Sequence, residues 1–195
     1  TGTANTALGW KALFTNVGGD RNVAVGNEAL EAMNPSAGTD SYNVAVGFRS
    51  LKTLNAGADG ENTAVGNNTG TSMTTAIYNT VVGSQSGDAL TDGSSNVAVG
   101  MNALTADTRG QNSVAIGRNA LLAQNFTTST DSYNVAIGRD AGKAVTTGTL
   151  NTIIGGLSGD ALTDGSGNVS LGYNSLSADT RGTNSVALGR NALAV

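Results

Sequence analysis

"NVAVGNEAL" at residues 22–30 returns as "NVAVGFRSL" at 43–51, "NVAVGMNAL" at 96–104 and "SVAIGRNAL" at 113–121. A phrase that recurs along a chain identifies a repeat architecture, which decides the fold before any single element is assigned. The glycine that closes the phrase occurs at Gly9, Gly26, Gly47, Gly66, Gly83, Gly100, Gly117, Gly138, Gly155, Gly172 and Gly189. The spacing is 17 residues in seven cases, 21 in two and 19 in one, which gives eleven units.

Each unit follows one residue pattern when its closing glycine is counted as position 0. Position −4 is Asn in nine units and Ser in two, position −3 is Val or Thr, position −2 is chiefly Ala, and position −1 is Val, Ile or Leu. Such a run predicts a short β-strand that ends at a glycine, where a positive φ is easily adopted. We expect Asn ladders and glycine turns between stacked units, represented by Asn22, Gly26, Asn43, Gly47, Asn96, Gly100, Asn134 and Gly138.

A second arm follows the glycine in every unit. Position +4 is Leu in seven units, as at Leu30, and Gly in the other four. Where position +4 is Gly, an apolar residue stands three places later, at Met73, Leu90, Val145 or Leu162. We therefore expect each second arm to supply one large apolar residue to a common core.

A longer period lies over the short one. Residues 83–122 and 155–194 align without gaps at an offset of 72 and are identical at 29 of 40 positions, which relates segment 66–137 to segment 138–195. We interpret residues 1–195 as a single repeat domain.

The 17-residue period predicts an all-β fold. A strand–helix–strand unit takes about 30 residues or more, and the phrase has no helical periodicity. The prediction is a parallel β-solenoid, of the β-roll or β-helix kind, with about eleven rungs of 17–21 residues. At about 4.8 Å per rung, the rod would be roughly 50 Å long.

The strand phrase also predicts association between chains. No residue from position −4 to position 0 is charged in any unit, so neither strand face is typical of a surface exposed to water. We expect Val23 and Val25 to fill the rung, and the small Ala24 face to lie against another chain. Because the same face repeats at every rung, a parallel assembly about a common long axis is the natural closed form.

Composition excludes several functional classes. The chain has no Cys and no His, so it has no thiol nucleophile, no Ser-His-Asp triad and no ordinary zinc site, and we expect no catalytic residues, no metal and no cofactor. The formal net charge of −4 makes nucleic acid an improbable partner. No stretch approaches the roughly 18 apolar residues that cross a bilayer, so we expect no membrane insertion by this segment.

The repeated phrase Asn-Thr/Val-Ala-Val-Gly-x-x-Ala-Leu resembles the head repeats of trimeric autotransporter adhesins, and still more the longer repeats of phage tail-fibre-type proteins. The resemblance covers Asn5 to Leu193. It implies a parallel homotrimer that acts as a non-catalytic attachment fibre, located outside the cell, at the cell surface or on a virion tail. The implied partners are the chain itself and a cell-surface glycan or protein receptor.

Two sets of residues are candidates for receptor contact. The first lies in the long units, where four-residue insertions emerge and commonly carry binding: Met33, Asn34, Pro35, Gln124, Asn125 and Phe126. The second is a set of aromatic residues at position +1, where an exposed ring could stack on a sugar: Trp10, Phe48 and Tyr173. The alternative for both sets is structural, as tolerated loops, plugs against a neighbouring chain or isolated surface rings.

Three functions remain open at this point. The preferred one is a tail-fibre or adhesin segment for host or surface attachment, and the first alternative is an autotransporter head that binds host matrix or cells. The second alternative is a polysaccharide-degrading spike, in which a carboxylate pair such as Asp88 with Asp92 would need one protonated and one ionised member. This pair recurs in duplicated turns, which favours a structural role, and we expect no enzyme.

Overall fold

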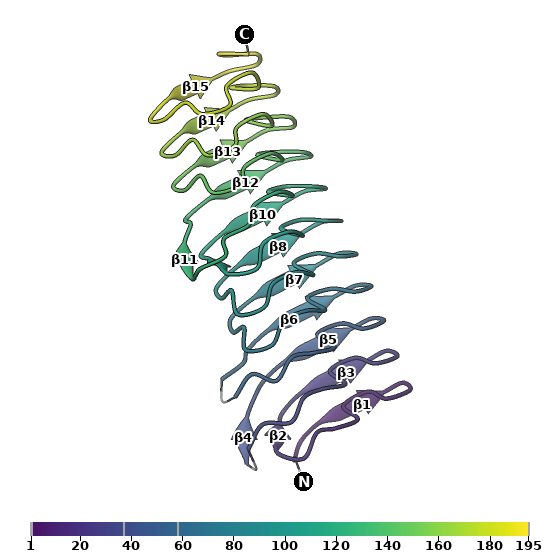
Figure 1. Cartoon of the computed structure of the whole chain (residues 1–195). Helices are drawn as coiled ribbons and strands as arrows, with labels where there is room; N and C mark the ends of the chain where they lie inside the picture. The colour runs from purple at the N-terminus through teal and green to yellow at the C-terminus, as the bar shows by residue number, and fades with distance from the viewer. Residues whose placement is uncertain (1, 37, 58, 195) are drawn as a thin grey trace.

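The computed structural model describes residues 2–36, 38–57 and 59–194. The chain coils into a stack of rungs that rises from the N-terminus to the C-terminus (Figure 1). This arrangement confirms the predicted parallel β-solenoid of about eleven turns. Among the described residues, no helix has the length and apolar character required to cross a membrane.

Eleven three-residue strands form one parallel sheet along the whole rod. In sheet order they are β1 (Thr6–Leu8), β3 (Val23–Val25), β5 (Val44–Val46), β6 (Thr63–Val65), β7 (Thr80–Val82), β8 (Val97–Val99), β10 (Val114–Ile116), β12 (Val135–Ile137), β13 (Thr152–Ile154), β14 (Val169–Leu171) and β15 (Val186–Leu188). Each strand pairs with the equivalent residues of the next, as Ala24 pairs with Ala45, so every position of the repeat forms a column along the rod.

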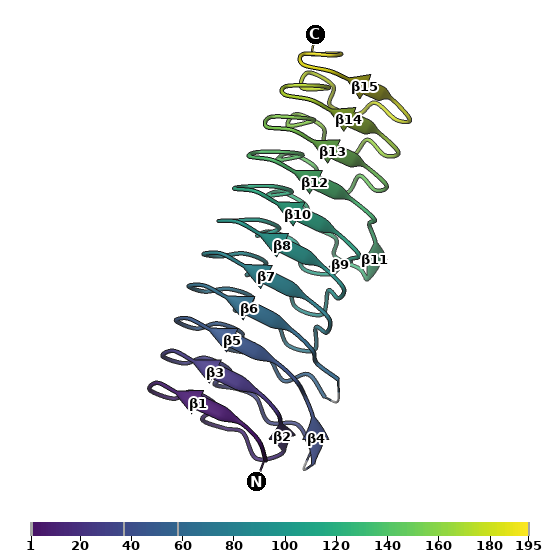
Figure 2. The same ribbon diagram turned by 180° about the vertical axis from the view of Figure 1, so that it is seen from behind.

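The two 21-residue units add a pair of small parallel sheets. β2 (Gly19–Asp20) pairs with β4 (Thr39–Asp40), and β9 (Gly110–Gln111) pairs with β11 (Thr130–Asp131). Seen from behind, both pairs lie at the same corner of the rod (Figure 2). The extra residues are thus accommodated at one corner without interrupting the long sheet.

The core lies between the sheet and the second arms, and the structure corrects the predicted direction of the strand. From β3 to β15 the position −2 residues are buried, as Ala24 and Ala98 are, and only Ala7 in the terminal strand β1 is exposed. Val23 and Val25 are only half-buried on the outer face. The prediction that valines fill the rung and that the Ala face meets another chain was therefore wrong. The interior is narrow because the second arm already supplies a buried Leu30, so only a small residue fits opposite it.

Packing between the arms shows the same size constraint. The two units with a large position −2 residue, Val81 and Ile153, have Gly87 and Gly159 at position +4. A Cβ on Gly87 would lie 2.9 Å from Cγ1 of Val81. The apolar residues predicted to replace the missing leucines are fully buried, which confirms the two kinds of second arm: Met73, Leu90, Val145 and Leu162.

The predicted Asn ladder is present in the core beside the strands. Oδ1 of Asn22 accepts the backbone N–H of Asn43 at 2.9 Å, and Oδ1 of Asn43 accepts the backbone N–H of Asn62 at 3.0 Å. The closing glycines form the adjacent column, with φ near 136° at Gly26 and 134° at Gly47. The ladder and the glycine column fix the register of successive rungs.

Candidate functional site

The outer face of the long sheet is the most extensive feature of the surface. It consists of positions −3 and −1, which are Val, Ile, Leu or Thr in every rung. These side chains remain partly accessible, with Val65 37%, Ile116 36% and Leu171 42% exposed. We call these two columns the sheet face.

The size of the sheet face is unusual for a protein that works as a monomer. It runs the length of an eleven-stranded sheet and contains no charged residue. Monomeric proteins rarely expose contiguous apolar patches larger than a few hundred Å², and larger ones mark interaction sites. The sheet face is therefore the candidate functional site of this chain.

One border of the sheet face is the turn after each closing glycine. Position +2 has a φ near 55° there, as in Lys11 and Arg49, so the turn projects from the rod. The aromatic residues predicted at position +1 are exposed, with Trp10 at 61%, Phe48 at 40% and Tyr173 at 51%. We call positions +1 and +2 the turn edge.

Cationic side chains lie over the exposed rings of the turn edge. Nζ of Lys11 is 4.5 Å from the ring centroid of Trp10, and the guanidinium carbon of Arg49 is 4.8 Å from that of Phe48. At exposed sites a contact of this kind contributes about 0.5–1 kcal/mol, which favours these positions of the rings. Binding of a sugar to them stays a prediction.

A charged network supports the turn edge near the N-terminus. Glu28 accepts hydrogen bonds from Nζ of Lys52 at 2.6 Å and from Nε of Arg49 at 2.8 Å. The hydrogen bond from Lys52, followed by that from Arg49, lowers the pKa of Glu28, while the hydrogen bond to Glu28 raises the pKa of Lys52. The network locks three successive second arms together through Glu31, which contacts both Lys52 and Lys11.

The opposite border of the sheet face is the corner that precedes the Asn ladder. Position −5 has a positive φ at this corner, and Tyr42, Tyr78 and Tyr133 are 42%, 47% and 53% exposed there. An open pocket of about 610 Å³ is lined by Tyr42, Asp59, Glu61 and Thr63. We call positions −8 to −5 the corner edge.

The long units do not present the predicted receptor-contact residues as one surface. Met33 and Gln124 are fully buried and Phe126 is 6% exposed, so these three side chains pack inside the chain. Asn34 and Asn125 are exposed and Pro35 is half-buried. Oδ1 of Asn34 accepts the backbone N–H of Val17 at 3.2 Å. Met33, Gln124 and Phe126 therefore fit the structural role given above as the alternative to receptor contact.

Gln124 has a role that sequence reasoning missed. Its Nε2 donates to Oδ2 of Asp107 at 2.6 Å and to Oγ of Ser113 at 2.9 Å, and its Oε1 accepts from Asn134 at 2.9 Å. Ser113 stands where most units have Asn, and Gln124 spans the gap that the shorter side chain leaves in the ladder. The sequence signal for this role was a Ser at position −4, at Ser113, followed directly by a 21-residue unit that contains Gln124.

The carboxylates considered for hydrolysis have separate surroundings. Asp92 forms an ion pair with Nε of Arg109 at 3.3 Å and accepts a hydrogen bond from Thr91. Asp88 lies on the second arm, and burial raises the pKa of its carboxyl.

Comparison of the chain with protein-family models, with curated proteins and with solved structures gives no match.

Proposed function

We propose that the chain is a rigid segment of a trimeric fibre that mediates attachment to a host or another surface, from outside a cell or on a virion tail. The observation that carries the proposal is the sheet face, which offers half-exposed β-branched residues in every rung and no charge. Because the alanines face inward, the proposed interface consists of these larger residues and not of the alanines. The interface thereby gains apolar area.

The energetics of the sheet face favour association of copies. Fully burying a Val, Ile or Leu side chain contributes about 1.5–3 kcal/mol, so covering half-exposed ones contributes about 1 kcal/mol each. Because the face is continuous over all rungs, a partner with the same repeat can cover it throughout. A second and a third copy of this chain meet that requirement, and the resemblance to trimeric fibres supports three.

Attachment would use the outer surface of such a fibre. The exposed rings at Trp10, Phe48 and Tyr173 are candidates for shallow contacts with a cell-surface glycan or protein. Three copies around one axis would convert weak single contacts into avidity through effective concentration. The rod itself would provide reach and stiffness.

The test of self-association is the native mass of the chain, measured by sedimentation equilibrium alongside circular dichroism. We expect a β-type spectrum and the mass of a trimer. Val99→Lys, which places a charge within the sheet face, should give a monomer. The control Ser72→Lys places the same charge on an exposed residue of the second arm and should leave the mass unchanged. A monomeric wild-type chain would refute the proposal.

The test of attachment is binding of the wild-type chain to a glycan microarray, with intact cells as a second probe. We expect binding that falls when Tyr173→Ala or Trp10→Ala is introduced and that persists in Ser72→Lys. Release of sugar from a capsule preparation would instead identify a polysaccharide-degrading spike.

A further inference from the structure

The two edges of the sheet face carry opposite charge. The turn edge has five basic residues, Lys11, Arg49, Arg118, Arg139 and Arg190, and two acidic ones, Glu28 and Asp140. Both acidic side chains are nearly covered, since Glu28 is 8% and Asp140 7% exposed. Lys11, Arg49 and Arg139 pair with carboxylates, at Glu31, Glu28 and Asp140 respectively. Within the described residues, the unpaired charge on the turn edge is therefore positive and lies on Arg118 and Arg190.

The corner edge has the opposite composition. Its basic residues are Arg21, Arg109 and Arg181, and each pairs with a carboxylate of the same edge, at Asp40, Asp92 and Asp164 respectively. Its remaining exposed carboxylates, on Asp59, Glu61 and Asp131, have no ion-pair partner within residues 2–36, 38–57 and 59–194. The accessible, unpaired charge on the corner edge is therefore negative.

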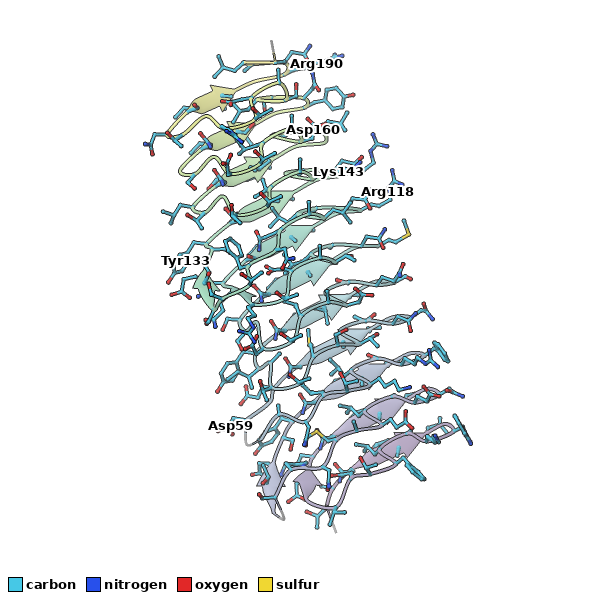
Figure 3. All side chains as sticks on the ribbon, viewed as in Figure 1. Asp59, Arg118, Tyr133, Lys143, Asp160 and Arg190 are labelled. Atoms are coloured by element: carbon cyan, nitrogen blue, oxygen red, sulfur yellow. The ribbon has the colours of Figure 1, made fainter. Side chains whose placement is uncertain are left out.

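The two edges lie on opposite sides of the rod. Figure 3 shows Arg118 and Arg190 projecting on one side of the stacked strands, and Asp59 and Tyr133 on the other. The sheet face separates the two rows, so the unpaired cations and anions of one chain cannot reach each other. A neighbouring chain can bring them together.

We infer that neighbouring copies pack in parallel around a common axis, with the turn edge of each copy against the corner edge of the next. The inference rests on the proposed parallel self-association and adds which edges meet and which charged residues pair between copies. When parallel copies are related by rotation about a common axis, one edge of each copy meets the opposite edge of its neighbour. Positive and negative edges then alternate around the axis at every interface.

An antiparallel face-to-face dimer would place the same edges differently. Turning one copy end over end to cover the sheet face brings turn edge against turn edge and corner edge against corner edge. The basic residues of the two turn edges would then face each other. The acidic residues Asp59, Glu61 and Asp131 of one copy would face the acidic corner edge of the other copy. Like-charge contacts of this kind oppose association, so the charge pattern selects the parallel form.

Particular contacts follow from the position of each residue in the repeat. Arg118 belongs to the seventh unit and Asp131 to the start of the eighth; Arg49 belongs to the third and Glu61 to the start of the fourth. Both pairs therefore need the same displacement of one rung between neighbouring copies. Nε of Arg49 donates to Glu28 of the same chain. The terminal nitrogens of Arg49 therefore remain able to contact the pocket at Asp59 and Glu61 of the neighbouring copy.

Crosslinking can test the polarity directly because the chain contains no cysteine. The double variant Arg118→Cys/Asp131→Cys, treated with a short bismaleimide, should give covalent dimers and trimers. Met101→Cys lies on the turn edge of the central rung and should give no crosslinked product. Only an antiparallel dimer would place residue 101 of one copy beside residue 101 of the other. Covalent dimers of Met101→Cys, with no crosslinking of the double variant, would overturn the inference.

Charge reversal supplies a second readout. Arg118→Glu and Asp131→Arg should each weaken association about tenfold or more, because an attractive contact becomes repulsive at three interfaces at once. The combination of both should restore it, and salt should weaken the wild-type assembly. Lys143→Glu, on the second arm outside both edges, is the matched control and should have no effect.

The outcomes separate the two proposals. A wild-type chain that sediments as a monomer refutes the self-association on which the inference rests. A trimer in which neither the double cysteine variant crosslinks nor the charge swap restores affinity refutes the edge pairing alone.

Discussion

Removing one amide from the Asn ladder should destabilise the rod far more than removing an exposed one. Asn79 is fully buried, and its Oδ1 accepts the backbone N–H of Asn96 at 2.9 Å. Its Nδ2 donates to the carbonyl oxygens of Gly93 at 2.9 Å and Ile77 at 3.1 Å. Nδ2 also donates to Oδ1 of Asn62 at 3.2 Å. The variant Asn79→Ala deletes all four contacts and fills none of the space.

The magnitude follows from those contacts. Each hydrogen bond contributes about 1 kcal/mol net, and a buried N–H left without an acceptor costs about 1–3 kcal/mol. The Asn96 N–H becomes such a donor, so the free energy of unfolding should fall by about 2–4 kcal/mol. Asn67→Ala changes the same residue type at an exposed turn position of the preceding rung and should cost less than about 0.5 kcal/mol.

Denaturant unfolding at one fixed protein concentration gives the free-energy change, since association and unfolding are linked. Amide hydrogen exchange adds a local measure, because rungs open as near neighbours and the Asn96 N–H should exchange faster in the Asn79 variant. Equal losses in the Asn79 and Asn67 variants, or unchanged exchange at Asn96, would refute the role given to the ladder.

Two further predictions concern the glycine column and the charged network. Gly100→Ala should lower the free energy of unfolding by about 3 kcal/mol or more, because φ is 135° and the new Cβ would lie 2.6 Å from the carbonyl carbon of Gly117; a loss below about 1 kcal/mol in denaturant titration would contradict this. The lowered pKa of Glu28 means that its contacts with Lys52 and Arg49 stabilise the fold above the ordinary pKa of 4.5 and lose that effect as the pH falls through the lowered value. Glu28→Gln should therefore lower the Tm at neutral pH, and the difference from wild type should vanish in acid; a difference that is independent of pH would exclude the ionised contacts as its cause.

The repeat alone was sufficient to predict the solenoid. A column of identical residues can form only if successive units stack in register, so the spacing of Gly26, Gly47 and the other closing glycines predicted the rungs and the parallel sheet. The Asn ladder and the buried leucines at position +4 followed from the same argument, because both require equivalent residues to lie one rung apart.

The strand direction could not be settled from the strand phrase alone. Both faces of "NVAVG" at 22–26 are uncharged, so hydrophobicity does not distinguish inside from outside. A usable signal lay in the second arm, where Gly87 and Gly159 accompany the large residues Val81 and Ile153. Such size compensation indicates that position −2 and position +4 share one core.

The sequence by itself determined the period, the parallel stacking and the residues that repeat in register, because these depend only on spacing along the chain. Only the tertiary structure decided that alanine faces inward and valine outward, that Gln124 closes the ladder at Ser113, and that Arg118 and Arg190 lie on the side of the rod opposite Asp59. These features depend on the width of the rung and on where each turn directs its side chains, which are set when the two arms close on each other.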